Sequence, residues 1–182
     1  MPHYANPVAR VTILRFHQPE ALEQAAERLA DGAHEIQNTF VDCLLVDEQP
    51  VGTCRPVERG RQPELRCRLL WKRLAGADAL VLAVPAGNPE AVALMRRLFA
   101  DCATVAGVAP DVLVGKVGTA FTEAGTGSLP GIALLRDLGL TIVGPEPDGG
   151  NGDSLRRLGR RVAQAAQQAA HVRARRQYDP SA

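Results

Sequence analysis

A glycine-rich stretch at residues 118–127 is the part of the sequence best suited to holding a ligand. It reads Gly-Thr-Ala-Phe-Thr-Glu-Ala-Gly-Thr-Gly. Gly125 and Gly127 lack a Cβ atom, so the backbone there can approach a flat ligand closely. The hydroxyls of Thr122 and Thr126 can donate or accept hydrogen bonds beside it. An ordinary glycine-rich turn would carry the same residues, so the surrounding elements decide the interpretation.

Short apolar runs alternate with amphipathic stretches along the chain, and this alternation predicts the elements that would position the loop. Strands are predicted over 10–16, 39–46, 78–84, 116–121 and 140–143. Helices are predicted over 19–33, 65–74, 89–103, 129–138 and 153–175. The run at 78–84 is apolar on both faces, as a central parallel strand must be. The predicted fold class is α/β: a three-layer, doubly wound, parallel five-stranded sheet of the flavodoxin-like order 2-1-3-4-5.

Finer features of these elements also follow from the pattern. Leu22, Ala25, Ala26 and Leu29 fall on one face of the first helix, and Gly32 is its expected stop. The inward face of the last helix is expected to hold Leu155, Leu158, Val162, Ala165, Ala169 and Val172. Residues 1–178 are predicted to form a single domain, with 179–182 as a frayed tail.

The four cysteines form no C-x-x-C pair, so neither a zinc knuckle nor a thioredoxin-like motif is predicted. Cys43 in a strand pattern and Cys102 on an apolar helix face are interpreted as small core residues. Cys54 and Cys67 lie in a polar stretch, where only an exposed thiol of lowered pKa would be reactive.

A sheet of this order binds ligands beyond the carboxyl ends of its first, third and fourth strands. The loops at those ends follow Phe16, Val84 and Phe121. Each leads into a helix, whose first amides and dipole favour an anion. These three loops are therefore the candidate ligand site.

The third loop and its surroundings resemble the WrbA family of multimeric flavodoxin-like quinone reductases. In that family the fourth strand ends in G-x-x-F-T-x-x-G-T-G, which is matched by Gly118, Phe121, Thr122, Gly125, Thr126 and Gly127. The likeness is detailed over residues 76–144 and extends over 10–175 in layout. The resemblance implies a protein that binds FMN, accepts hydride from NAD(P)H, reduces quinones and forms tetramers.

By this resemblance, the cofactor-binding candidates lie in the three loops. They are Arg15, His17, Pro85, Ala86, Gly87, Asn88, Thr122, Glu123, Ala124, Gly125, Thr126 and Gly127. Arg15, His17 and the amides of the first helix would take the phosphate, and Gly87 and Asn88 would contact the ring. The third loop would hold the pyrimidine edge and the ribityl chain. No catalytic residue and no metal ligand is predicted.

Two of the loops depart from the family's pattern. The family's first loop is rich in Ser or Thr and has a Gly, whereas here His17 lies near the expected hydroxyl and Glu20 near the expected Gly. A carboxylate that close to a phosphate costs on the order of a few kcal/mol, and Pro19 removes an amide donor. The second loop lacks the family's aromatic residue, which weakens ring stacking. The alternative is therefore a flavin-free flavodoxin-fold module that acts through protein–protein binding.

The composition and net charge limit the kinds of partner that the protein is expected to bind. The net charge is +1 over 182 residues, so the protein has no strong overall positive potential that would favour binding to nucleic acid. No segment approaches 18 consecutive apolar residues and no signal-peptide layout is present, so a cytoplasmic protein without a membrane partner is expected. The expected partners are a small-molecule electron acceptor and other copies of the chain, in a homodimer or homotetramer.

Two segments are candidates for contacts between copies. One is the apolar side of the helix at 95–103. The other is the segment 55–73, which has seven basic and two acidic residues. The simplest interpretation of the second segment is a solvated helix and loop, and binding of the NADPH phosphate is another alternative.

Overall fold

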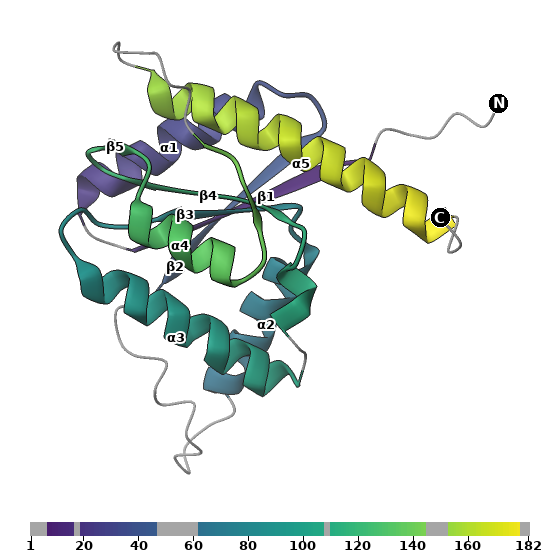
Figure 1. Ribbon diagram of the computed structural model, residues 1–182, viewed down its shortest axis with the longest axis horizontal. Helices are drawn as coiled ribbons and strands as arrows, with labels where there is room; N and C mark the ends of the chain where they lie inside the picture. The colour runs from purple at the N-terminus through teal and green to yellow at the C-terminus, as the bar shows by residue number, and fades with distance from the viewer. Residues whose placement is uncertain (1–6, 17–18, 47–61, 108–109, 145–152, 179–182) are drawn as a thin grey trace.

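A parallel β-sheet with helices on both faces forms the core of the molecule (Figure 1). The computed structural model describes residues 7–16, 19–46, 62–107, 110–144 and 153–178. The parallel strands are β1 (Ala9–Phe16), β2 (Thr39–Val46), β3 (Ala79–Ala83), β4 (Val117–Thr122) and β6 (Thr141–Ile142). Their hydrogen-bonded order is β2-β1-β3-β4-β6, with β6 beside β4. This is the predicted five-stranded order 2-1-3-4-5, which the structure confirms.

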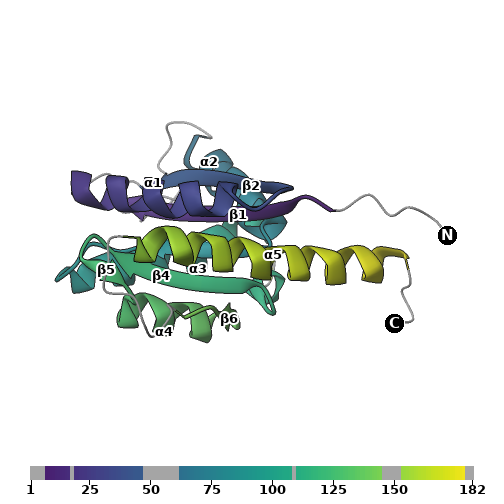
Figure 2. The same ribbon diagram turned by 90° about the horizontal axis from the view of Figure 1, so that it is seen from above.

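The helices divide between the two faces of this sheet. Helices α1 (Glu20–His34) and α5 (Ser154–Tyr178) pack together on one face, and Figure 2 shows them side by side. The other face is covered by α2 (Gln62–Gly76), α3 (Pro89–Ala106) and α4 (Leu129–Asp137). A short 3-10 helix, Pro110–Leu113, precedes β4. The result is the three-layer arrangement expected from right-handed crossovers.

Burial follows the position of each strand in the sheet. Every residue of β3 is buried, because this strand has neighbours on both edges and helices on both faces. Strand β2 pairs with β1 along one edge and is only partly covered, and Phe40 is 57% exposed.

The burial of the cysteines differs from the expectation. Cys43 lies on partly covered β2 and is exposed, so its interpretation as a core residue was wrong. Cys102 is fully buried, as expected. Cys67, on α2, is also buried in the core and is not an exposed thiol. Cys54 lies outside the described residues.

Two glycines allow α1 and α5 to cross closely. A Cβ atom on Gly32 would overlap the carbonyl oxygen of Arg156, and one on Gly159 would overlap the carbonyl oxygen of Leu29. Gly32 is buried inside α1, which continues to His34. The expectation that Gly32 ends the helix was therefore wrong: it is a packing residue, and its lack of a side chain brings two backbones together.

The inward face of α5 also differs from the expected one. Leu155, Leu158 and Val162 are buried as expected, but the buried stripe then passes to Ala163, Ala166 and Ala170. Ala165 and Ala169 are half-buried, and Val172 is 51% exposed. The expected stripe alternated steps of three and four residues, which average 3.5 per turn. A straight α-helix drifts about 20° per heptad from such a repeat, in the direction that favours Ala166 and Ala170 over Ala165 and Ala169.

The apolar side of α3 faces the core of the same chain. Met95, Phe99 and Cys102 are almost completely buried, while Arg96 and Arg97 lie on the exposed side. The apolar side at 95–103 is thus not available for contacts between copies, and that expectation was wrong. Of the basic segment 55–73, residues 55–61 lie outside the described part of the chain.

Among the described residues, no helix is both long and apolar enough to cross a membrane. The limits of the domain, 1–178 with a frayed tail, stay a prediction.

Candidate functional site

The three candidate loops follow β1, β3 and β4, which are parallel neighbours, so all three lie at the carboxyl edge of the sheet. His17, one of the predicted phosphate ligands, lies outside the described residues. The first loop is described from Pro19, and the second and third loops are described throughout.

The second loop is a tight turn that leads into α3. The Asn88 N–H donates to the Pro85 carbonyl over 3.4 Å. Gly87 has a φ of +70°, which the third position of a type II turn requires. Asn88 then caps α3, since its Oδ1 accepts from the N–H groups of Glu90 and Ala91 at 3.1 and 3.2 Å. The loop geometry is therefore set by its own hydrogen bonds.

The third loop is a short hairpin, which the sequence pattern did not reveal. Strand β5 (Gly125–Thr126) folds back antiparallel on the end of β4, pairing Thr122 with Gly125. Glu123 and Ala124 form the two-residue tip between the paired positions. The Thr122 Oγ1 accepts from the Ala124 N–H at 3.2 Å, so this hydroxyl stabilises the turn.

A carboxylate joins the second and third loops. Both oxygens of Glu123 accept from the Ala86 N–H, at 3.1 Å for Oε1 and 2.9 Å for Oε2. The two residues are 37 positions apart. Both were candidates from the sequence, but nothing in the pattern indicated that they bond to each other. Their contact depends on the parallel register of β3 and β4, which places the two loop tips side by side.

Open space lies beside three loop glycines. Gly87, Gly125 and Gly127 have φ values of +70°, +143° and +99°. In the part of the chain that the structure describes, a Cβ atom on any of them would meet no atom within 4 Å. Their backbone conformation favours glycine, while no packing against the described residues demands it. These loops thus leave room for a ligand to lie directly against the backbone.

The other glycines of this region have a different role. A Cβ atom on Gly118 would press on the Leu140 side chain at 3.0 Å, and one on Gly131 would lie 2.7 Å from the Ala120 Cβ. Gly118 is part of the recognised motif, yet here it allows β4 to pack under α4. Ser128, which was not among the candidates, caps α4 with its Oγ 3.4 Å from the Gly131 N.

The start of α1 is the remaining part of the site. Pro19 is its N-cap residue and provides no side-chain cap. Glu20 is exposed, and its Oε1 accepts from the Gln24 Nε2 one turn along the helix at 3.4 Å. The Arg15 Nη2 pairs with Glu23 of α1, while its Nη1 is buried and has no hydrogen-bond partner among the described residues. Arg15 thus faces the first turns of α1 rather than the second and third loops.

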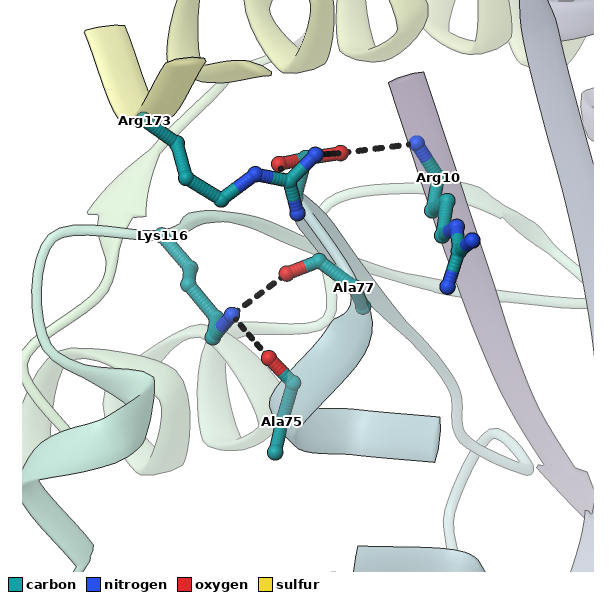
Figure 3. Close-up of polar contacts among 6 residues, drawn as sticks. Arg10, Ala75, Ala77, Lys116 and Arg173 are labelled. Atoms are coloured by element: carbon teal, nitrogen blue, oxygen red, sulfur yellow. Dashed lines mark hydrogen bonds and ion pairs between the residues drawn. The ribbon is translucent and has the colours of Figure 1, made fainter. Parts of the chain in front are cut away.

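A second polar cluster lies at the opposite, amino edge of the sheet (Figure 3). The Asp78 carboxylate is 3% exposed, accepts from the Arg10 N–H at 2.9 Å, and pairs with Arg173 at 3.1 Å. The Lys116 Nζ donates to the carbonyls of Ala75 and Ala77 at the end of α2. These bonds tie α2 and α5 to the sheet, at the edge away from the three loops.

Burial governs the pKa values in this cluster. It raises the pKa of Asp78, against the lowering effects of the Arg10 N–H and the Arg173 charge. Burial likewise lowers the pKa of Lys116, against the attraction of Asp78. Among the described residues, no three His, Cys, Asp or Glu side chains gather as a metal ion would need.

Comparison with known proteins gives one related sequence and a set of similar structures. No protein-family model matches the chain. A protein of Methanosarcina barkeri named NAD(P)H dehydrogenase (quinone) is 31% identical over 134 residues. This match covers 65% of the chain and 64% of the relative's own length.

The similar structures include a flavodoxin, WrbA-like protein from Agrobacterium tumefaciens, with a TM-score of 0.54 and 17% identity. It matches 88% of this chain and 99% of its own. A flavodoxin from the domain Archaea has a TM-score of 0.55 and 15% identity, over 87% of this chain and 99% of its own. The chain therefore has the flavodoxin-like fold, and the resemblance to WrbA-type proteins that its motif at 118–127 predicted is confirmed.

Proposed function

We propose that this chain binds FMN and uses NAD(P)H to reduce quinone-like acceptors. The observation that carries the proposal is the pair of loops at the carboxyl edge of β3 and β4, whose glycines at positive φ have no described residue packed against them. A crevice at this edge is where doubly wound sheets bind ligands. The name of the Methanosarcina barkeri relative, NAD(P)H dehydrogenase (quinone), supports the same activity.

Some features of the described residues favour the binding of a flat cofactor with a phosphate, and others oppose it. The backbone at Gly125 and Gly127 is free of side chains, so a ring can lie directly against it. The start of α1 has no side-chain cap, and the exposed Glu20 carboxylate is bonded along the helix to Gln24, so the helix dipole there favours a phosphate while the Glu20 charge opposes it. Against this, the Ala86 N–H is already bonded to Glu123.

The chain's contribution to the chemistry is position and electrostatics. Bound FMN would supply the hydride transfer between NAD(P)H and the acceptor. Gly87 and the backbone of Asn88 would contact one edge of the ring, and Thr122 and the segment 125–127 the other. Arg15, His17 and the first amides of α1 would hold the phosphate. The open side beside the loop glycines would admit the small-molecule acceptor.

The proposal is tested by titrating FMN into the purified protein and following the quenching of flavin fluorescence. Saturable quenching is expected, together with oxidation of NADH or NADPH that depends on both added FMN and a quinone. Protein that lacks flavin absorbance after purification and fails to quench FMN would overturn the proposal. Comparing the two nucleotides decides which one the protein prefers.

Assembly and location complete the proposal. The chain is expected to form a homodimer or homotetramer in the cytoplasm, with the neighbouring copy adding to the wall of the acceptor pocket. Light scattering at micromolar concentration should give a mass at least twice the 19.4 kDa of the chain. A monomeric mass under those conditions would remove this part of the proposal.

The second candidate function is a flavin-free module that binds another protein. The Glu123–Ala86 contact favours it, because the loops satisfy each other without a ligand. The fold tolerates the loss of a cofactor, since the core lies in the strands and in the inward faces of the helices. The FMN titration separates the two candidates: tight binding by the wild-type protein excludes the flavin-free module.

A further inference from the structure

The contact between Glu123 and Ala86 lies where the ring of the proposed cofactor would be held, so this inference rests on the proposed function. Ala86 is the second residue of the turn at 85–88. The turn's own hydrogen bond runs from the Asn88 N–H to the Pro85 carbonyl and leaves the Ala86 N–H free for another acceptor. Glu123 is that acceptor, with both of its oxygens.

The contact is not needed to satisfy a buried amide. Ala86 is exposed, so water would serve its N–H if Glu123 were absent. What the carboxylate does instead is connect the tips of two loops. It is well placed for this, because the hairpin pairing of Thr122 with Gly125 fixes Glu123 at the tip of the third loop. A hydrogen bond to a charged acceptor is also stronger than one to a neutral acceptor.

We infer that Glu123 lowers the flavin affinity of the site by occupying the Ala86 N–H in the free protein. A flavin ring presents a carbonyl oxygen or a ring nitrogen to such an amide, and both are neutral acceptors. The flavin must therefore displace a stronger acceptor than itself. The same loops without the carboxylate would bind the ring more tightly.

The inference is tested by titrating both FMN and riboflavin into the full-length wild-type chain, Glu123→Ala and Glu123→Gln. Glu123→Ala should bind each flavin at least about tenfold more tightly, which corresponds to one charged hydrogen bond no longer displaced. Glu123→Gln retains a weaker, neutral acceptor and should fall between the two. Riboflavin is included because it lacks the phosphate, so a gain shared by both flavins places the effect at the ring.

Glu90→Ala is the matched control. Glu90 is an exposed carboxylate in the first turn of α3, beside the same loop, and its removal leaves the Glu123–Ala86 contact in place. It should change either affinity by less than about twofold, as is usual for an exposed charge. Circular dichroism and thermal unfolding establish that each variant is folded. In the cofactor-free protein, the amide resonance of Ala86 should shift in Glu123→Ala and stay in place in Glu90→Ala.

Each remaining outcome overturns the inference in a recognisable way. A gain for FMN alone would mean that Glu123 acts by repelling the phosphate. Equal or weaker binding of both flavins by Glu123→Ala would mean that the carboxylate does not compete with the ring, while the proposed function would stand. An unmoved Ala86 resonance would show that the contact is absent in solution. If no variant binds either flavin, the proposed function falls together with the inference.

Discussion

Asn88 is the residue on which the geometry of the second loop depends. Its side chain accepts from the N–H groups of Glu90 and Ala91, and its own N–H closes the turn to Pro85. One residue thus starts α3 with its side chain and closes, with its backbone N–H, the turn that presents the Ala86 N–H. Ser128 likewise caps α4 with its side chain, next to the third loop.

Replacing Asn88 with Ala should lower the free energy of unfolding by about 1 kcal/mol, because the first amides of α3 lose their acceptor. Asn88→Asp keeps an acceptor of the same length and should retain most of the stability. Urea unfolding followed by circular dichroism measures both variants. Equal stability of Asn88→Ala and the wild type would show that water replaces the cap at this exposed position.

At the scale of elements, the crossing of α1 and α5 depends on Gly32 and Gly159. Alanine in a helix interior is ordinarily more stable than glycine by about 0.5–1 kcal/mol. Here the added methyl group would meet the backbone of the opposite helix, which cannot move aside as a flexible side chain can. The two effects oppose each other, and the overlap is with carbonyl oxygens, so the steric cost should dominate.

Gly159→Ala is therefore expected to destabilise the protein by about 1–3 kcal/mol, the usual cost of overpacking. Gln168→Ala, at an exposed position of the same helix, is the control for helix propensity and should be neutral. Chemical denaturation gives both values. An increase in stability for Gly159→Ala would mean that α1 and α5 lie further apart than described here.

At the scale of the whole molecule, the cluster at the amino edge links α5 to the sheet through the pair of Asp78 and Arg173. The raised pKa of Asp78 makes this link dependent on pH. A carboxyl group whose pKa is higher in the folded state stabilises the fold fully below its unfolded pKa of 3.8. That contribution is lost as the pH rises through the folded pKa.

Wild-type protein should therefore gain stability relative to Asp78→Asn as the pH is lowered from 7 toward 3. The measurement is the free energy of unfolding of both proteins across this range, with Asp137→Asn, which alters an exposed carboxylate, as the control. The opposite trend, with the wild type losing stability relative to Asp78→Asn on acidification, would show that the pairing with Arg173 outweighs burial.

Local sequence patterns were sufficient for most of the architecture. The strands at 10–16, 39–46 and 78–84 agree with β1, β2 and β3 to within a residue at each end. The helix stripe at Leu22, Ala25, Ala26 and Leu29 is buried as predicted. The motif at 118–127 also indicated the fold family correctly. These features succeed because burial repeats with the period of each element, and because a doubly wound sheet places its ligand loops at one edge.

Tertiary structure alone decided the features that depend on distant parts of the chain. Glu123 meets Ala86 only because β3 and β4 are adjacent in a fixed register. Gly32 has the sequence pattern of a helix stop, but α5 crosses α1 there, and Cys43 lies in an apolar strand pattern, but β2 is only partly covered. Sequence periodicity specifies which face of an element is apolar. It does not specify which element lies against that face, because that depends on how the whole chain packs.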